Sequence, residues 1–371
     1  MKQIIDGYKE ALAGYPQAEV GAGKRIGYLC SYVPQELLTV PGLEPYSMHA
    51  PQCAGTDLAD TYMGRVTCSY MRCILEAFEE DRYEYLDGFV MTTGCDHMRR
   101  LHDNLAYLRK PDFLKLLDVP HKVSPAAIDW YTEELRRLAD DLAEAFDLEI
   151  TDALVRESIG KWNQARRLMV EIDRLRRADA PPLSGSEMIA LSAGFGARPI
   201  EANLRDLERL LDEARRTTDC SRAKARARLL LVSSQLDDIR YVEALEAGGG
   251  LLVGEIGCTA ASSFEGQVDE QAEPFRALAR RYLERLPCPR MMEEHSRLLE
   301  RIVEMRGERR ADGVIIVALK FCDSWAWEGT LLLRELREAG VPVLRLEREY
   351  FFSGEGQVAT RVQAFLESMG K

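Results

Sequence analysis

Along the first third of the chain, two patterns of apolar residues alternate. Short apolar runs, typical of buried strands, are separated by stretches in which apolar residues recur every three or four positions, as in amphipathic helices. The pattern predicts a helix opened by Pro34, helices at 69–80 and 96–108, and strands at 25–30, 44–49, 86–92 and 113–119. Because strands that alternate with helices pair in parallel, we expect a doubly wound α/β domain over residues 1–123.

The middle and the end of the chain follow different patterns. Helical periodicity alone fills residues 124–226, where Thr151 is placed to cap a long amphipathic helix. Alternation then returns, with predicted strands at 229–232, 250–253, 313–318 and 341–346. The predicted fold is therefore α/β, with two doubly wound parallel-sheet domains of about four strands each. The second domain covers 227–371, and the helical section lies between the two.

The two predicted α/β domains share a short sequence pattern. In each, an Asp-Gly pair opens a buried strand, and a Cys-Asp pair follows it and precedes a helix. The pairs begin at Asp87 and Cys95 in the first domain, and at Asp312 and Cys322 in the second. The pattern places both cysteines at the carboxyl ends of parallel strands, where open α/β sheets bind their ligands.

Composition narrows the possible partners and the compartment. The 371 residues are 46% hydrophobic and 30% charged, as in a soluble globular protein of roughly two or three domains. The net charge of -12 argues against nucleic acid as a partner, because phosphates need clustered basic residues. The first residues lack the apolar core of a secretory signal, and no apolar run approaches the ~20 residues that span a bilayer. We expect a cytoplasmic protein without a membrane partner.

The nine cysteines are the main candidates for chemistry. In a reducing cytoplasm they are not expected to form structural disulfides, and Cys73 is expected in the core. The absence of Cys-x-x-Cys argues against zinc ribbons, thioredoxin sites and ferredoxin loops. Cys68, Cys95 and Cys322 each precede a predicted helix, whose N–H groups and dipole are expected to lower the thiol pKa. Three such thiolates are placed to converge across a cleft between the domains.

Several motifs, in order along nearly the whole chain, carry a family resemblance. They are YLCSYVPQEL at 28–37, CSYMR at 68–72, CDHMRRL at 95–101, RRYLERLPCP at 280–289, LKFCD at 319–323, and EREY, GQ and TRVQAFL in the tail from 347 to 366. In this ordered set the chain resembles the 2-hydroxyacyl-CoA dehydratase/benzoyl-CoA reductase family.

The resemblance implies a cofactor and a reaction. The implied cofactor is a [4Fe-4S] cluster on Cys68, Cys95 and Cys322, or an [8Fe-9S] double cubane. Because a [4Fe-4S] cluster normally takes four thiolates, three would leave one iron of the cluster open to another ligand. The implied activity is that of an iron–sulfur subunit of a 2-hydroxyacyl-CoA dehydratase, a lyase. One electron from an ATP-hydrolysing iron–sulfur activator converts the thioester carbonyl of the acyl-CoA substrate into a ketyl radical, which expels the 2-hydroxyl group. The implied partner is a homologous subunit in a homo- or heterodimer.

One segment departs from the family, and it keeps alternatives open. Residues 254–265 read GEIGCTAASSFE, without the usual Asp-Asp and Arg-Tyr pairs. The alternatives are a double-cubane cluster reductase of small molecules, a benzoyl-CoA reductase-type subunit, and a non-catalytic paralogue that carries a cluster. Weaker candidates are Ser31 and His49 as catalytic residues, Cys30 as a pocket or core residue, Cys288 as a reserve ligand, and His97 and His102 as helix-surface or cluster-supporting groups.

Overall fold

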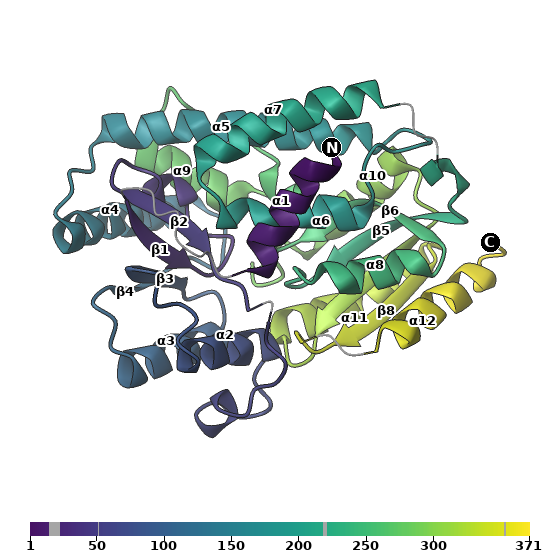
Figure 1. Ribbon diagram of the computed structural model, residues 1–371, viewed down its shortest axis with the longest axis horizontal. Coiled ribbons are helices and arrows are strands. Elements are labelled where there is room, and N and C mark those ends of the chain that lie inside the picture. Colours follow the sequence, from purple (N-terminus) through teal and green to yellow (C-terminus); the bar gives the residue numbers. More distant parts are fainter. Residues whose placement is uncertain (15–22, 51, 218–220, 352–353) are drawn as a thin grey trace.

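Two parallel sheets of four strands each organise the computed structural model, which describes residues 1–14, 23–50, 52–217, 221–351 and 354–371 (Figure 1). The first sheet has the order β2-β1-β3-β4 and the second the order β6-β5-β7-β8. Their bounds are β1 (Lys24–Tyr28), β2 (Leu43–Ser47), β3 (Gly88–Thr92), β4 (Leu114–Leu117), β5 (Ala227–Ser233), β6 (Gly250–Gly257), β7 (Gly313–Leu319) and β8 (Val343–Arg348). All pairings are parallel, so the predicted fold class is confirmed.

The two sheets repeat one another in detail as well as in strand order. Asp87 accepts a hydrogen bond from the backbone N–H of Arg25 at the start of β1, at 2.9 Å. Asp312 accepts the equivalent bond from Arg228 in β5, also at 2.9 Å. The Asp-Gly pattern seen in the sequence therefore marks the same corner of both sheets.

Helices cover both faces of each sheet, as buried parallel strands require. They are α1 (Lys2–Ala13), α2 (Ser69–Glu79), α3 (Asp96–Leu108), α4 (Pro125–Phe146), α5 (Asp152–Leu175), α6 (Gly185–Gly194), α7 (Ile200–Arg216), α8 (Ile239–Ala247), α9 (Pro274–Glu284), α10 (His295–Arg309), α11 (Asp323–Glu338) and α12 (Glu355–Ser368). Helices α2 and α3 pack on one face of the first sheet, and α4 and α9 on the other. The second sheet lies between α8 with α12 and α10 with α11.

Local sequence explains where several elements begin. The side chain of Thr151 accepts a hydrogen bond from the N–H of Leu154, which confirms the predicted cap of α5. The helix predicted to open at Pro34 is a single 3-10 turn, η1 (Gln35–Leu38), with Pro34 as its N-cap. Further 3-10 turns are η2 (Ala59–Thr61), η3 (Phe195–Ala197), η4 (Ser221–Lys224) and η5 (Ala261–Phe264).

Two helices pack across the predicted domain boundaries of 1–123, 124–226 and 227–371. Helix α9, from the last third of the chain, packs against α4 over the first sheet. Helix α1, at the N-terminus, packs with α5, α6 and α7 in the helical section, as Figure 1 shows for α1 and α6. The boundaries themselves stay a prediction, but the three sections share cores.

Candidate functional site

A cavity of about 210 Å³ lies where the carboxyl ends of strands from both sheets meet the helical section. Its walls contain all six free cysteines of the described residues: Cys30, Cys68, Cys95, Cys258, Cys288 and Cys322. The three ligands implied by the family resemblance are therefore brought to one place. Cys30, Cys258 and Cys288 join them.

Each α/β unit supplies three of these cysteines, of which only Cys95 and Cys322 occupy matching positions, after β3 and β7. In the first unit, Cys30 follows β1, and Cys68 and Cys95 are the N-cap residues of α2 and α3. In the second unit, Cys258 follows β6 directly, Cys288 lies between α9 and α10, and Cys322 is the N-cap of α11.

The backbone of Cys30 is strained at this site. Its φ of 83° lies in the left-handed region, which is costly for a residue with a side chain. Such strain persists only where the surrounding structure enforces it, and it clusters at functional sites.

The thiols act on one another across the whole cavity. Cys258 and Cys288 are hydrogen-bonded to each other, and the charges of Cys30 and Cys322 also raise the pKa of Cys258. The charges of Cys68, Cys95 and Cys288 raise the pKa of Cys322. Within the described residues, no three His, Cys, Asp or Glu side chains are grouped to hold a single metal ion. The cysteines line a wider space, as a cluster whose irons each take one thiolate would need.

The predicted lowering of the thiol pKa at the helix N-termini is wrong. Burial raises the pKa of Cys68 despite hydrogen bonds from the N–H groups of α2. Burial likewise raises the pKa of Cys95 to about 12 and that of Cys322 further. Desolvation outweighs the helix ends because burial removes the water that would stabilise a thiolate, and the charges of other cysteines raise the pKa of Cys95 and Cys322 further. Metal coordination deprotonates a thiol outright, so this donor set fits a metal cluster.

Four arginines line the same cavity, and their charges are unevenly compensated. Arg166 forms a buried ion pair with Glu36, whose pKa it lowers against the effect of burial. Arg281, Arg285 and Arg290 have no carboxylate within ion-pair distance in the described part of the chain, and the Nε of each is buried without a partner there. Uncompensated buried cations favour an anionic occupant, and a thiolate-ligated cluster is anionic.

Cys288 shows the effect of the arginines directly. A hydrogen bond from Cys258 lowers the pKa of Cys288 to about 6, with further lowering by the N–H of Arg290 and by the charges of Arg290 and Arg285. Both guanidinium groups also lie over the ring of Tyr32, at 4.5 Å for Arg285 and 4.6 Å for Arg290. The thiol of Cys288 thus lies beside positive charge.

The histidine and serine candidates are placed differently. Ser31 lines the cavity and accepts a hydrogen bond from Arg285 at 2.6 Å. His97 also lines it; its Nδ1 accepts from the N–H of Cys68 at 3.3 Å, and its Nε2 lies 3.9 Å from Asp323, beside Cys322. His97 therefore connects the segments that carry Cys68, Cys95 and Cys322. His102 is on α3, where its Nδ1 contacts Asp103 at 3.5 Å.

His49 lies in a separate cavity, which contains none of the six free cysteines. Its Nδ1 is 2.5 Å from a carboxylate oxygen of Asp237, which also accepts a hydrogen bond from the Tyr350 hydroxyl at 2.8 Å. Gln235 donates to the same oxygen at 3.1 Å and itself lines the cysteine cavity. A catalytic role for His49 stays a prediction, and the structure offers it only an indirect connection to the site.

Two further cysteines form a disulfide, so the expectation of no disulfides is wrong for this pair. Cys53 and Cys73 are bonded, with their Cα atoms 5.8 Å apart. The loop after β2 folds back over α2 and brings Cys53 within the distance that a disulfide requires. Cys73 is buried as expected. Cys220 lies outside the described residues.

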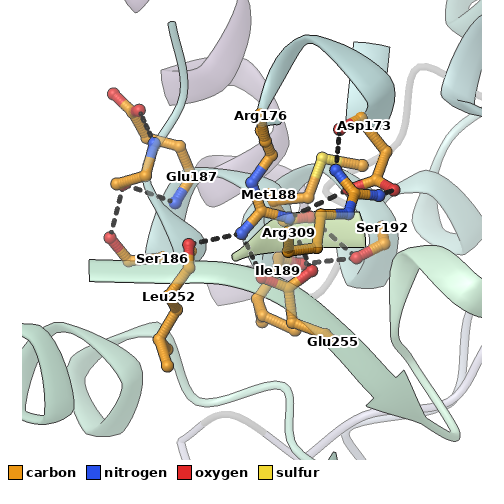
Figure 2. Close-up of polar contacts among 12 residues, drawn as sticks. Asp173, Arg176, Ser186, Glu187, Met188, Ile189, Ser192, Leu252, Glu255 and Arg309 are labelled. Atoms are coloured by element: carbon orange, nitrogen blue, oxygen red, sulfur yellow. Dashed lines mark hydrogen bonds and ion pairs between the residues drawn. The ribbon is translucent and has the colours of Figure 1, made fainter. Parts of the chain in front are cut away.

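A buried ion-pair network anchors β6, the strand that ends at Cys258, to the helical section (Figure 2). Arg176, at the end of α5, donates to Glu255 on β6 at 2.6 Å and to the carbonyl oxygen of Leu252 at 2.6 Å. Asp173 contacts Arg176 at 3.1 Å and pairs with Arg309 of α10. The network holds β6 in place, and Cys258 of the cavity directly follows this strand.

Sequence reasoning missed Cys258 and the arginines. Cys258 follows a predicted strand, so the rule that selected Cys95 also applied to it. Arg281 and Arg285 fall in the motif at 280–289, but nothing in their spacing indicated that they would lie unpaired beside a cavity.

Comparison with known proteins identifies the family. Residues 30–369 match the model of the 2-hydroxyglutaryl-CoA dehydratase D-component, and the chain belongs to this family. The chain is 27% identical to a putative dehydratase subunit, YjiM, of Escherichia coli strain K12, over 93% of this chain and 91% of that protein.

More distant relatives have assigned activities. The chain is 21% identical to the (R)-phenyllactyl-CoA dehydratase beta subunit of Clostridium sporogenes, over 99% and 97% of the two chains. It is 22% identical to a subunit of benzoyl-CoA reductase of Thauera aromatica, over 86% and 84%. The family resemblance seen in the motifs is thus confirmed. None of the helices among the described residues is long and apolar enough to cross a membrane.

Proposed function

We propose that the chain is an iron–sulfur reductase of this family that holds its cofactor on six thiolates. One observation carries the proposal: the six free cysteines of the described residues line one cavity, three from each α/β unit. Cys68, Cys95 and Cys322 form one ligand group, and Cys30, Cys258 and Cys288 form the other. Two groups of three thiolates suit two joined cubanes, the [8Fe-9S] double cubane, better than a single [4Fe-4S] cluster, which normally takes four thiolates.

The second ligand group favours the small-molecule reductase over the dehydratase. Its member Cys258 lies in the segment that departs from the dehydratase pattern, where charged and aromatic residues are replaced. A 2-hydroxyacyl-CoA dehydratase subunit acting through a ketyl radical is the second candidate, and the dehydratase subunits among the relatives favour it.

Residues of this chain supply the remaining functions of the site. When bound, the cluster supplies single low-potential electrons. Trp162, Phe195 and Phe264 line the cavity and exclude water from it. The hydroxyl of Ser31, fixed by Arg285, is placed to hydrogen-bond a substrate beside the cysteines. Cys95 is the most exposed residue of the six cysteines, although its thiol faces the buried cavity, so electrons enter there from an ATP-hydrolysing iron–sulfur activator. The partner of the chain is a second copy or a homologous chain.

The experiment combines the anaerobically purified protein with an ATP-hydrolysing activator, a reductant and ATP. The expected result is ATP-dependent oxidation of the reductant that is stimulated by azide or nitrite, two small reducible anions, without CoA. Formation of an unsaturated acyl-CoA from (R)-phenyllactyl-CoA or lactoyl-CoA, without stimulation by the anions, would favour the dehydratase. A protein that purifies without iron and accepts no electrons would refute both.

A further inference from the structure

Part of the cavity wall is aromatic. The helical section contributes Trp162 of α5 and Phe195 of η3, and η5 contributes Phe264. The two phenylalanine rings pack edge to face, with their centroids 5.2 Å apart, and Trp162 packs on Phe195 at 5.3 Å. These aromatic residues line the same cavity as the cysteines.

Arg281, on α9, lines the cavity together with these aromatic residues and is rigidly held. Its side chain is 8% exposed. One terminal nitrogen donates to the carbonyl oxygens of Ser263, at 2.8 Å, and Glu265, at 3.2 Å, and the guanidinium lies 4.8 Å from the ring centroid of Tyr282. Its Nε is buried and has no hydrogen-bond partner among the described residues. The side chain is therefore fixed in place, with one donor unused.

Within the described ranges, Arg281 has no ion-pair partner of its own; the charge of Glu36 acts on it only from a distance. Glu36 is itself paired with Arg166. Burial, reinforced by the charge of Arg166, lowers the pKa of Arg281 to about 9. Arg285 and Arg290 act on the thiol of Cys288, but the main influences on Arg281 include no cysteine. The thiolates of the proposed cluster therefore do not account for this cation.

We propose that Arg281 binds a small anion and that the substrate of the cavity belongs to this class. As a statement about substrate it rests on the proposed function, whereas the binding itself does not. A guanidinium in a dry, aromatic-walled site binds an anion strongly, because low dielectric strengthens the charge-assisted hydrogen bond. The cavity of about 210 Å³ limits the anion to a few heavy atoms. Bound there, the anion shares the cavity with the aromatic residues and the cysteines.

The test uses acetate and acetamide, which have the same shape but differ in charge. Calorimetric titration of the wild-type protein is expected to show one acetate site per chain and at least tenfold weaker binding of acetamide. Arg281→Met should weaken acetate binding at least tenfold, and Arg281→Lys should weaken it less. The matched control is Arg276→Met, on the same helix, where the exposed Arg276 pairs with Asp129 on the surface; it should bind acetate like the wild type. Circular dichroism checks the fold, and Arg281→Lys keeps the test decisive if Arg281→Met is unstable.

Titrating both cluster-loaded and cluster-free protein separates the two proposals. If the protein holds no iron, the proposed function fails, yet acetate binding that depends on Arg281 would still support the anion site. If iron is present and Arg281→Met binds acetate as tightly as the wild type does, the anion site is refuted while the cluster stands. Equal affinity for acetate and acetamide would also overturn it.

Discussion

Replacing Glu255 by glutamine is expected to destabilise the protein strongly, although the change removes only one charge. The side chains of Glu255 and Arg176 are both fully buried. Around them, two arginines, Arg176 and Arg309, face two carboxylates, Glu255 and Asp173, so the network shown in Figure 2 is neutral. Glu255→Gln leaves an excess positive charge in the interior.

The magnitude follows from burial. Removing one partner of a buried pair costs about 3–5 kcal/mol, because the other charge stays desolvated and uncompensated. The matched control is the exposed pair Arg177–Glu308, which joins the same helix end to α10 at 2.7 Å, with side chains 44% and 36% exposed. Arg177→Met should cost less than about 1 kcal/mol. The double variant with methionine at 176 and 255 should cost less than Glu255→Gln, because it removes both charges of the pair.

The assay is denaturant unfolding of the cluster-free protein, with the free energy of unfolding compared among the four proteins. Iron content after anaerobic purification is a second measurement, because Glu255 lies on the strand that leads into Cys258. If Glu255→Gln and Arg177→Met lower the free energy of unfolding equally, the reasoning from burial is wrong. A double variant less stable than Glu255→Gln would also contradict it.

Three further predictions concern other parts of the chain. Cys322→Ser should give a folded protein that has lost half of its iron or more, because serine is a weak ligand; a full iron complement by metal analysis would exclude Cys322 as a ligand. Cys73→Ser, which removes only the disulfide, should keep its brown colour, and a colourless protein would show that the disulfide is needed to hold α2 and Cys68. Although partial burial opposes it, hydrogen bonds to Glu335 and Glu328 raise the pKa of His295 above 6.5. The stabilisation by protonated His295 is therefore complete below pH 6.5 and is lost as pH rises through the raised pKa. His295→Gln should lower the free energy of unfolding by up to about 1 kcal/mol at pH 6 and hardly at pH 9. Equal losses at both pH values would refute the assignment.

Much of the fold could be predicted because local patterns determine it. Period-two and buried runs gave the eight strands, and the side chain of Thr151 caps α5 as its position before an apolar periodic stretch indicated. The long-range packing of α9 on the first sheet could not be predicted, since its apolar face fits any partner surface.

The candidate site was predictable only in part. Cys95 and Cys322 could be predicted because each follows a predicted strand, and the same argument applies to Cys258. The sign of the thiol pKa shifts was not predictable, because it depends on how far the cavity excludes water, which no local pattern records. Whether Arg281 has an ion-pair partner could not be predicted either, because it depends on which carboxylates the fold brings within ion-pair distance.

Iron and acid-labile sulfide per chain, measured after anaerobic purification of the wild type and Cys258→Ser, test the six-thiolate site most directly. With two joined cubanes, the wild type should hold about eight irons, and Cys258→Ser should lose half of them or more. About four irons in the wild type, unchanged in Cys258→Ser, would show that Cys30, Cys258 and Cys288 do not form a second ligand group. That result would support a single cluster on Cys68, Cys95 and Cys322.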